Sequence, residues 1–484
     1  MQQSQASKIT IGYIAISAAK FVFMLSGFAI YFALPRLLSP ADFGNYGVTI
    51  GFLSIFNMML VIGAIQTVSK FVSEQPEQKR PIMATAFRSQ ALLGGGISLL
   101  LLLSAPYLAK IFKDPSLTSP FRIGAGIPFF YAFYATVIGL LNGQKRYQAQ
   151  AMMDMATAVI KTVCIISLAY VTRRVEGAVA AFFLTSILIA SMALVLYRNR
   201  HPNHPSEAPK FPLKTLLNFQ FSIMLLTLMG HVLLTQDLFL IKYYSGRFCT
   251  PDSAGFYTSA QTLSRIPQVL VIALNLVMFP VISSSTYRND GNTSRRAVEA
   301  AFRFPLIAIA PLAVFLSAFS TECLALVFPA PYSAAAPALQ ILAPAVFILA
   351  LLQLGTTVIT GGGRPWLSIR ISLVGILFQA SACLLLTPAF GLRGAAWGSG
   401  IGWAVGLLFC GNIIFHHFKT RGPLLTLLRA VPAGALTWFS THYLPFSGIP
   451  RLISGLIFTT LVYWGLLLVM GERGFRIRSQ PDQL

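Results

Sequence analysis

Long apolar runs follow one another along almost the whole chain, and they constrain its fold more than any other feature. A helix needs about 20 predominantly apolar residues to cross the hydrocarbon core of a bilayer. Runs of this kind occupy residues 9–34, 45–68, 90–112, 120–141, 151–171, 177–197, 216–241, 255–281, 304–328, 337–359, 367–387, 394–417, 430–445 and 451–470. The sequence therefore predicts an all-α polytopic membrane protein with about 14 transmembrane helices.

The composition agrees with a chain that lies mostly in lipid. Charged residues make up only 10% of the 484 residues, whereas soluble domains carry roughly 25%. The formal net charge of +22 is typical of nucleic-acid-binding proteins, but the basic residues here are spread between apolar runs and form no stripe. We therefore expect no nucleic-acid partner. The five cysteines form no CxxC pair, so we expect neither a disulfide framework nor a metal site.

The distribution of Lys and Arg predicts the orientation of the chain. Of the 36 basic residues, 23 fall in the connections on the side of the N-terminus and 10 in those on the opposite side. Connections rich in Lys and Arg lie in the cytoplasm. We therefore expect both termini in the cytoplasm, together with the two longest connections, residues 198–215 and 282–303.

An internal duplication divides the chain. The motif [ST]-P-x-x-x-G-x-Y occurs at Ser39–Tyr46 and again at Thr250–Tyr257, and the block Leu108–Pro128 recurs with the same internal spacing as Leu324–Pro344. Each copy contains six apolar runs, so both copies enter the membrane in the same direction. Parallel repeats are related by an axis along the membrane normal, and transporters bind their substrate between them.

The duplication predicts the domain organisation. We expect an N-terminal six-helix lobe (1–200), a cytoplasmic linker (201–215), a C-terminal six-helix lobe (216–418), and two extra helices with a cytoplasmic tail (419–484). This arrangement favours a two-lobed transporter with a central cavity over a channel or a scaffold.

Three cations lie near the middle of predicted spans: Lys20, Lys161 and Arg265. Ionisable residues within a span cost roughly 2.5–3.5 kcal/mol on insertion scales, so they usually face an interior cavity. At 100° per residue, Arg265 shares one helix face with Gln261, Gln268 and Asn275. A weaker polar stripe in the run 216–241 includes His231. We predict that these residues line the cavity and bind an anionic substrate; the alternative is that the cations are structural partners of buried acids.

The acidic residues near or within the spans are few. Asp154 lies seven residues before Lys161 on the same face, and Asp237 and Glu322 lie near span ends. These three are candidates for coupling transport to H+ or Na+. Asp42 and Asp252 lie in the two copies of the repeated motif, and we expect them to be gate residues that pair with the nearby Arg36 and Arg247.

The loop Leu34–Tyr46 resembles the R-x-L-x-P-x-x-F-G signature of bacterial polysaccharide and oligosaccharide flippases. The stretch Phe328–Leu342 and the turn Gly391–Ala396 are also similar to that family, the O-antigen type lipid-linked oligosaccharide flippases of the multidrug/oligosaccharidyl-lipid/polysaccharide exporter superfamily. The resemblance covers the whole chain in helix number, loop lengths and repeat. Its motifs do not identify a particular sugar.

The resemblance implies a function and a location. It implies that a glycan linked to undecaprenyl diphosphate moves from the inner to the outer leaflet of the bacterial cytoplasmic (inner) membrane. It also implies a cationic central cavity with basic residues on helices 1 and 8, which corresponds to Lys20 and Arg265 here. The last two helices would shape a groove for the lipid tail. Membrane lipids, a polysaccharide polymerase and chain-length machinery are the partners that this pathway implies.

Other functions remain alternatives at this point. A cation-coupled multidrug exporter shares the two lobes of six helices, although it usually binds cationic drugs through buried acids. A membrane glycosyltransferase or polymerase ordinarily needs acidic or His residues on outer loops, and here those loops are short and basic. The sequence contains no GxxxxGK[ST], HExxH or GxSxG motif. We therefore expect a transporter that is not an enzyme and uses no cofactor.

Overall fold

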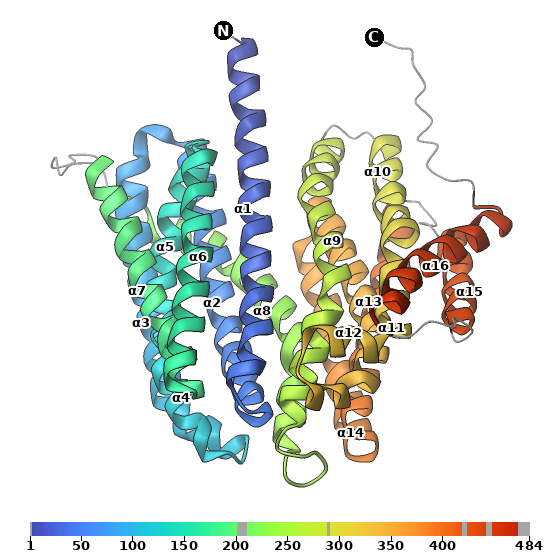
Figure 1. Cartoon of the computed structure of the whole chain (residues 1–484). Helices are drawn as coiled ribbons and strands as arrows, with labels where there is room; N and C mark the ends of the chain where they lie inside the picture. The colour runs from blue at the N-terminus through green and yellow to red at the C-terminus, as the bar shows by residue number, and fades with distance from the viewer. Residues whose placement is uncertain (1, 201–210, 288–290, 419–423, 442–447, 473–484) are drawn as a thin grey trace. The chain divides into compact units, whose positions relative to one another are not determined.

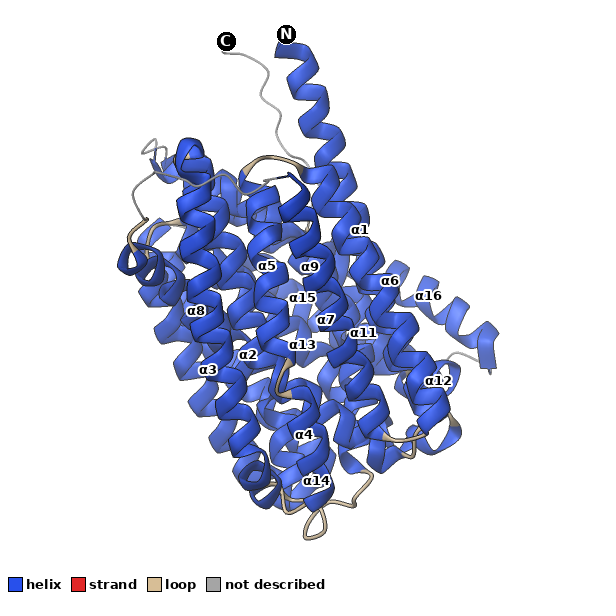
Figure 2. Cartoon of the chain, turned by 90° about the vertical axis from the view of Figure 1, so that its left-hand side faces the viewer, coloured by secondary structure: helices blue, strands red, loops and turns tan. Residues whose placement is uncertain are grey.

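The computed structural model describes residues 2–200, 211–287, 291–418, 424–441 and 448–472. Within these ranges every regular element is a helix (Figure 2), apart from an isolated bridge between Ser245 and Cys249. Eleven helical stretches of the described chain are long and apolar enough to cross a membrane. The prediction of an all-α polytopic membrane protein is therefore confirmed.

The elements follow one another as α1 (Gln2–Leu37), α2 (Pro40–Glu74), η1 (Pro76–Gln78), α3 (Lys79–Ile111), η2 (Pro115–Leu117), α4 (Thr118–Gly124), α5 (Ile127–Gly143), α6 (Tyr147–Thr172), α7 (Val175–Arg200), α8 (Leu213–Tyr243), α9 (Ser253–Tyr287), α10 (Gly291–Phe304), η3 (Pro305–Ile309), α11 (Ala310–Ala318), α12 (Ser320–Val327), η4 (Ala330–Ala335), α13 (Ala336–Gly361), α14 (Pro365–Phe418), α15 (Leu424–Ser440) and α16 (Gly448–Val469). Most of the predicted apolar runs fall within these helices, but the run 120–141 is divided between α4 and α5, and residues 442–445 of the run 430–445 lie outside the described residues. The run 304–328 is divided among η3, α11 and α12. A π-helical turn at Pro305–Ile309 interrupts the regular spiral, and Phe319, with φ of −108° and ψ of 33°, separates α11 from α12.

The helix α14 contains two of the predicted runs in one element. Its backbone reverses at Gly391, where φ is 56° and ψ is −130°. Two glycines of its second half pack on the first half: Gly398 lies against Cys383 and Gly402 against Gln379. Small residues let helices approach closely within a membrane, so these glycines allow the two halves of α14 to pack together.

The described chain forms two compact units, Met1–Thr258 and Ser259–Leu484, and their boundary falls within α9. In the first unit α2 packs on α5 and α8, and α1 packs on α6. One apolar cluster of this unit joins Val68 of α2, Leu140 of α5 and Leu216 of α8. The helix α8, which the repeat assigns to the second half of the sequence, is thus packed against the first half.

In the second unit α13 packs on α14 and α11. The last two helices, α15 and α16, pack on each other and on α11, and both can be followed in red in Figure 1. Tyr463 of α16 donates a hydrogen bond from its hydroxyl to the carbonyl oxygen of Leu306 at 2.7 Å, and Trp464 donates to Ile307 at 2.9 Å. The π-helical turn η3 frees backbone carbonyl groups, and these two side chains satisfy them.

Candidate functional site

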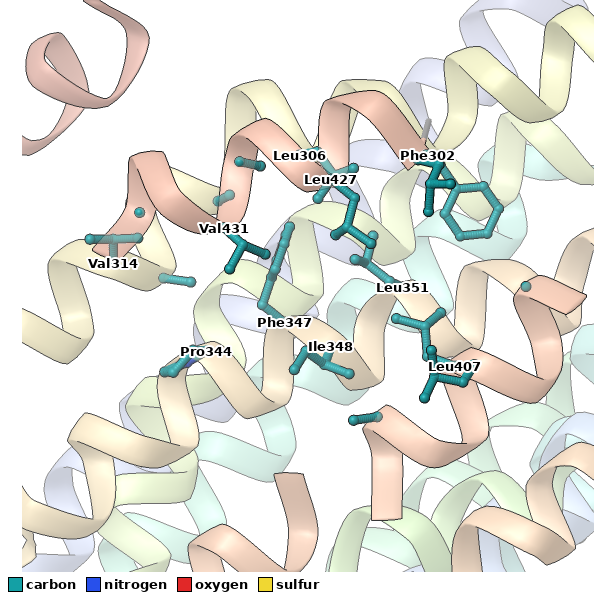
Figure 3. Close-up of a pocket in the computed structure, with 18 of the residues that line it drawn as sticks. Phe302, Leu306, Val314, Pro344, Phe347, Ile348, Leu351, Leu407, Leu427 and Val431 are labelled. Atoms are coloured by element: carbon teal, nitrogen blue, oxygen red, sulfur yellow. The ribbon is translucent and has the colours of Figure 1, made fainter. Parts of the chain in front are cut away.

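An apolar cavity of about 990 Å³ lies in the second unit, where α15 and α16 meet the rest of that unit. Figure 3 shows its walls, to which residues of α10, η3, α11, α13, α14, α15 and α16 contribute. Its lining comprises Phe302, Leu306, Ala310, Ala313, Val314, Ser317, Pro344, Phe347, Ile348, Leu351, Ala404, Leu407, Leu408, Gly411, Asn412, Ile414, Phe415, Leu424, Leu427, Ala430, Val431, Gly434, Ala435, Trp438 and Tyr463.

The shape of the cavity follows from its long walls of small and branched residues. One wall extends from Phe302 to Ser317, about 22 Å at the 1.5 Å rise of a helix. Phe302 and Leu427 lie near one end in Figure 3, and Val314 and Pro344 near the other. Two of the polar side chains in the wall donate hydrogen bonds to backbone carbonyl oxygens, Ser317 to that of Gln340 at 2.6 Å and Tyr463 to that of Leu306 at 2.7 Å. The cavity therefore suits an elongated apolar molecule.

The predicted cations of the first unit lie on α1 and α6. Lys20 is exposed, and its charge acts on the carboxylate of Asp154. Asp154 is half-buried and accepts a hydrogen bond of 2.6 Å from the hydroxyl of Tyr134 on α5. Lys20 and Asp154 belong to separate predicted spans, and the fold brings the two side chains close enough for their charges to interact.

Lys161 has an aromatic environment that the sequence did not indicate. Its ammonium lies 4.6 Å from the ring centroid of Phe23 on α1 and 5.6 Å from that of Phe182 on α7. Both distances fall within the range of a cation–π interaction. Two rings therefore stabilise this cation at a half-buried position.

The predicted polar stripe lies on α9, and those of its residues whose side chains are described belong to the second unit. Gln261 and Gln268 are buried, and Gln268 donates a hydrogen bond of 3.0 Å to Gln353 of α13. Arg265 is half-buried between them along the helix. The side chain of Asn275 lies outside the described residues. His231, the fifth polar residue singled out in the sequence, is half-buried on α8 in the first unit.

The remaining candidate acids have varied surroundings. Asp42 accepts a hydrogen bond of 2.9 Å from Ser39 at the start of α2, and Asp252 lies in the turn before α9. Asp237 is fully buried and accepts from the hydroxyl of Tyr257 at 2.8 Å. Glu322 forms an ion pair of 2.9 Å with Arg451 of α16. The pairs Asp42–Arg36 and Asp252–Arg247 stay predictions.

A polar network that the sequence did not reveal ties α8 to the rest of the first unit. The ammonium of Lys242 lies 2.6 Å from Oδ2 of Asp114, and the Lys242 side chain is only 4% exposed. Asn45 of α2 donates to Asp114 at 3.3 Å and to Ser116 at 3.0 Å. Burial alone would raise the pKa of Asp114, but hydrogen bonds from Lys242 and Ser116 outweigh it and hold that pKa below its ordinary value.

The two copies of the repeated motif touch beside this network. A Cβ on Gly44 would lie 2.5 Å from the backbone nitrogen of Gly255, and a Cβ on Gly255 would overlap the carbonyl oxygen of Pro40. Only glycine permits such an approach of two backbones. The repeated glycines thus form a close seam between the start of α2 and the start of α9.

The comparisons with known proteins agree with this architecture. A chain of 22% identity over 470 residues, an uncharacterized membrane protein of Methanocaldococcus jannaschii, covers 92% of this chain and 90% of its own length. A probable low-salt glycan biosynthesis flippase of Haloferax volcanii is 21% identical over 261 residues, which are 53% of this chain and 54% of that protein.

Solved structures show the same fold. The lipid II flippase MurJ in an inward closed conformation superposes with a TM-score of 0.75 at 14% identity and covers 95% of this chain and 98% of the flippase. An inward-facing multidrug transporter of the MATE family has a TM-score of 0.67 at 14% identity, over 84% of this chain and 99% of that transporter. The profile of one sequence family, described as polysaccharide biosynthesis protein, matches residues 33–337. The predicted resemblance is confirmed, and the chain belongs to this polysaccharide biosynthesis protein family.

Proposed function

We propose that this protein is a flippase that moves an oligosaccharide linked to undecaprenyl diphosphate, such as a unit of O-antigen, capsule or exopolysaccharide, from the inner to the outer leaflet. The observation that carries this proposal is the apolar cavity of about 990 Å³ beside α15 and α16. These two helices lie outside the duplicated part of the sequence. A substrate with a long prenyl chain needs an apolar binding site of this kind, which a small cationic drug does not.

The charged head of such a substrate needs cations. We assign this role to Lys20, Lys161 and Arg265, with Gln261 and Gln268 as hydrogen-bonding groups for the sugar. A guanidinium can bind a phosphate with two donors at once. The membrane potential favours outward movement of a negative head by roughly 2.3 kcal/mol per charge per 100 mV. Part of the cycle therefore needs no ATP, and Asp154, Asp237 and Glu322 are the candidate residues for coupling to H+ or Na+.

We propose that the mechanism is alternating access. In this proposal the protein lies in the inner membrane of a bacterial cell, and both termini lie in the cytoplasm. The seam at Gly44 and Gly255, together with the ion pair Asp114–Lys242, would then close the outer side. We propose this network as a gate contact in addition to Asp42 and Asp252, because Lys242 is buried and bridges α8 to the loop after α3.

A reconstituted system tests the proposed function. The purified full-length protein is placed in liposomes that contain a fluorescent prenyl-diphosphate oligosaccharide, and the fraction of label open to a membrane-impermeant quencher is followed in time. We expect the label to cross the bilayer much faster than in protein-free liposomes and faster with a potential that is negative on the side of origin. Crossing at the protein-free rate would refute a flippase. Transport of a cationic dye instead of the lipid would favour the multidrug exporter.

A further inference from the structure

Three buried polar side chains without hydrogen-bond partners lie inside the first unit, on α2, α3 and α8. In the described part of the chain, neither Oε1 nor Nε2 of Gln90 and Gln220 has a partner, and the same holds for Oγ1 of Thr67. Each of these residues is at most 1% exposed. The large majority of buried polar side-chain atoms in proteins are paired. Three unpaired side chains in one unit therefore indicate groups that find their partners in another state of the protein.

Two apolar clusters show that the three side chains face one junction. One cluster includes Phe71, Ala86 and Leu216, and the other includes Leu60 and Met224, with Leu93 packed against it. Residues three, four or seven apart on a helix lie on the same face. Thr67 lies between Phe71 and Leu60 on α2, Gln90 between Ala86 and Leu93 on α3, and Gln220 between Leu216 and Met224 on α8. The polar layer therefore separates the two clusters where α2, α3 and α8 meet.

The junction is tightly closed in this structure. A Cβ on Gly63 of α2 would lie 2.7 Å from Cγ of Met224 and 3.3 Å from Cγ of Gln220. The missing side chain of Gly63 thus lets α2 and α8 pack closely. This close packing buries the carboxamide of Gln220, and a separation of the two helices would expose it.

The layer lies near the ends of two of these helices. Thr67 precedes the end of α2 at Glu74 by seven residues, and Gln220 follows the start of α8 at Leu213 by seven, about 10 Å along each axis. The proposed topology places these ends on the cytoplasmic side. Because the duplication assigns α8 to the second half of the sequence, alternating access would part α8 from α2 and α3 at this junction.

We propose that Thr67, Gln90 and Gln220 form an entry site for the glycan head of the substrate, which opens when the N-terminal half of α8 separates from α2 and α3. The inference rests on the proposed function and adds to it a hydrogen-bonding site apart from Gln261 and Gln268 on α9. A carboxamide and a hydroxyl each donate and accept hydrogen bonds, as the hydroxyl groups of a sugar do. The three side chains carry no charge, so they contact the sugar without trapping the diphosphate.

The proposal predicts that an apolar side chain of similar length stabilises the closed protein and slows transport. Gln220→Met removes two buried polar groups that have no partner in the closed junction, so it should raise the unfolding temperature. It also removes the hydrogen bonds to the sugar in the open junction, so it should slow flipping of a prenyl-diphosphate oligosaccharide several-fold. Gln220→Asn keeps a carboxamide and should recover part of the rate.

Gln379 of α14 provides the matched control, because it is equally buried but paired at both ends of its carboxamide. Its Nε2 donates to Ser399 at 3.2 Å, and its Oε1 accepts from Nε1 of Trp403 at 3.0 Å. Gln379→Met should therefore lower the unfolding temperature. If Gln220→Met lowers it too, the Gln220 carboxamide is already satisfied in the closed junction, and the proposal is overturned.

Three measurements on the purified full-length protein test the entry site. Thermal unfolding is followed in detergent, and flipping of the fluorescent prenyl-diphosphate oligosaccharide is followed in liposomes. Opening of the junction is measured by treating Gln220→Cys in liposomes with a membrane-impermeant thiol reagent and locating the modification by mass spectrometry. Cys383, which is 0% exposed, is the internal control. We expect modification at position 220 and none at Cys383.

The outcomes separate this inference from the proposed function. Flipping at the wild-type rate by both Gln220→Met and Gln90→Met would overturn the entry site alone. A Gln220→Cys protein that flips the lipid but stays unmodified at position 220 would overturn it as well. A wild-type protein that flips no prenyl-diphosphate oligosaccharide would refute the proposed function itself. In that case, modification at position 220 would still show that the junction opens.

Discussion

The ammonium of Lys242 at the end of α8 lies 2.6 Å from Oδ2 of Asp114 in the loop after α3. Removing one partner of a buried ion pair leaves an uncompensated charge, which costs of the order of 3 kcal/mol. We therefore expect Asp114→Asn to lower the free energy of unfolding by about this amount, as measured by denaturant unfolding in detergent.

The double variant Asp114→Asn, Lys242→Gln provides the control for this pair. It should be more stable than Asp114→Asn alone, because no buried charge is left without its partner. Arg295→Gln removes an exposed pair with Glu299 and should cost less than about 0.5 kcal/mol. Additive effects of the two substitutions at 114 and 242 would show that the pair is not coupled.

The pH dependence of the unfolding temperature should reflect the ionisation of the Asp114 carboxyl group. Its pKa lies below the ordinary value because the hydrogen bonds from Lys242 and Ser116 outweigh the effect of burial. A depressed pKa in the folded state contributes stability that is complete above the unfolded-state pKa of about 3.9 and is lost as the pH falls through the folded value. The difference in unfolding temperature between wild type and Asp114→Asn should be constant from neutral pH to about pH 5 and shrink below about pH 4. A difference that grows on acidification would contradict this sign.

The glycine seam makes a steric prediction. Gly255→Ala places a methyl group against the backbone of Pro40, which cannot rotate away as a flexible side chain can. We expect this variant to separate the starts of α2 and α9 and to abolish flipping in liposomes. Gly96→Ala on α3, where a Cβ meets nothing within 4 Å, should transport at the wild-type rate. Normal transport by Gly255→Ala would exclude a closed seam from the cycle.

The cavity can be filled from one position without a clash at the backbone. A Cβ on Gly411 of α14 meets nothing within 4 Å, and the residue lines the cavity. Gly411→Phe should therefore occupy the space of the prenyl chain and slow flipping at least several-fold with little loss of stability. The same substitution at Gly96, outside the cavity, should have no effect on flipping. Equal rates for the two variants would remove the cavity from the mechanism.

The mid-depth cations give a prediction about export in cells. We expect Lys20→Ala and Arg265→Ala to abolish glycan export while the protein still reaches the membrane, as judged by immunoblot of the membrane fraction. Arg265→Lys should retain part of the activity, because the charge survives and the two-donor geometry does not. Export at the wild-type level by the Lys20→Ala, Arg265→Ala double variant would contradict a cationic binding site.

Some of the candidate site was visible in the sequence and some was not. Lys20 and Arg265 stood out because a charge within an apolar run is costly wherever the run is packed. Lys242 was counted only as a loop charge at the end of a span, since nothing local marks its partner Asp114, which lies 128 residues away. The ion pairs of Glu472 were equally hidden, because its partners Arg303 and Arg429 come from two other helices.

The sequence by itself determined that this chain is built of membrane-spanning helices. Hydropathy decides this, because each apolar run must satisfy its backbone within its own helix once it lies in lipid. Only the tertiary structure decided which helices enclose the apolar cavity, where the two repeated glycines touch, and which acids lie beside which cations. Those contacts join residues far apart in the chain, and their energy depends on packing distances that no local pattern of residues specifies.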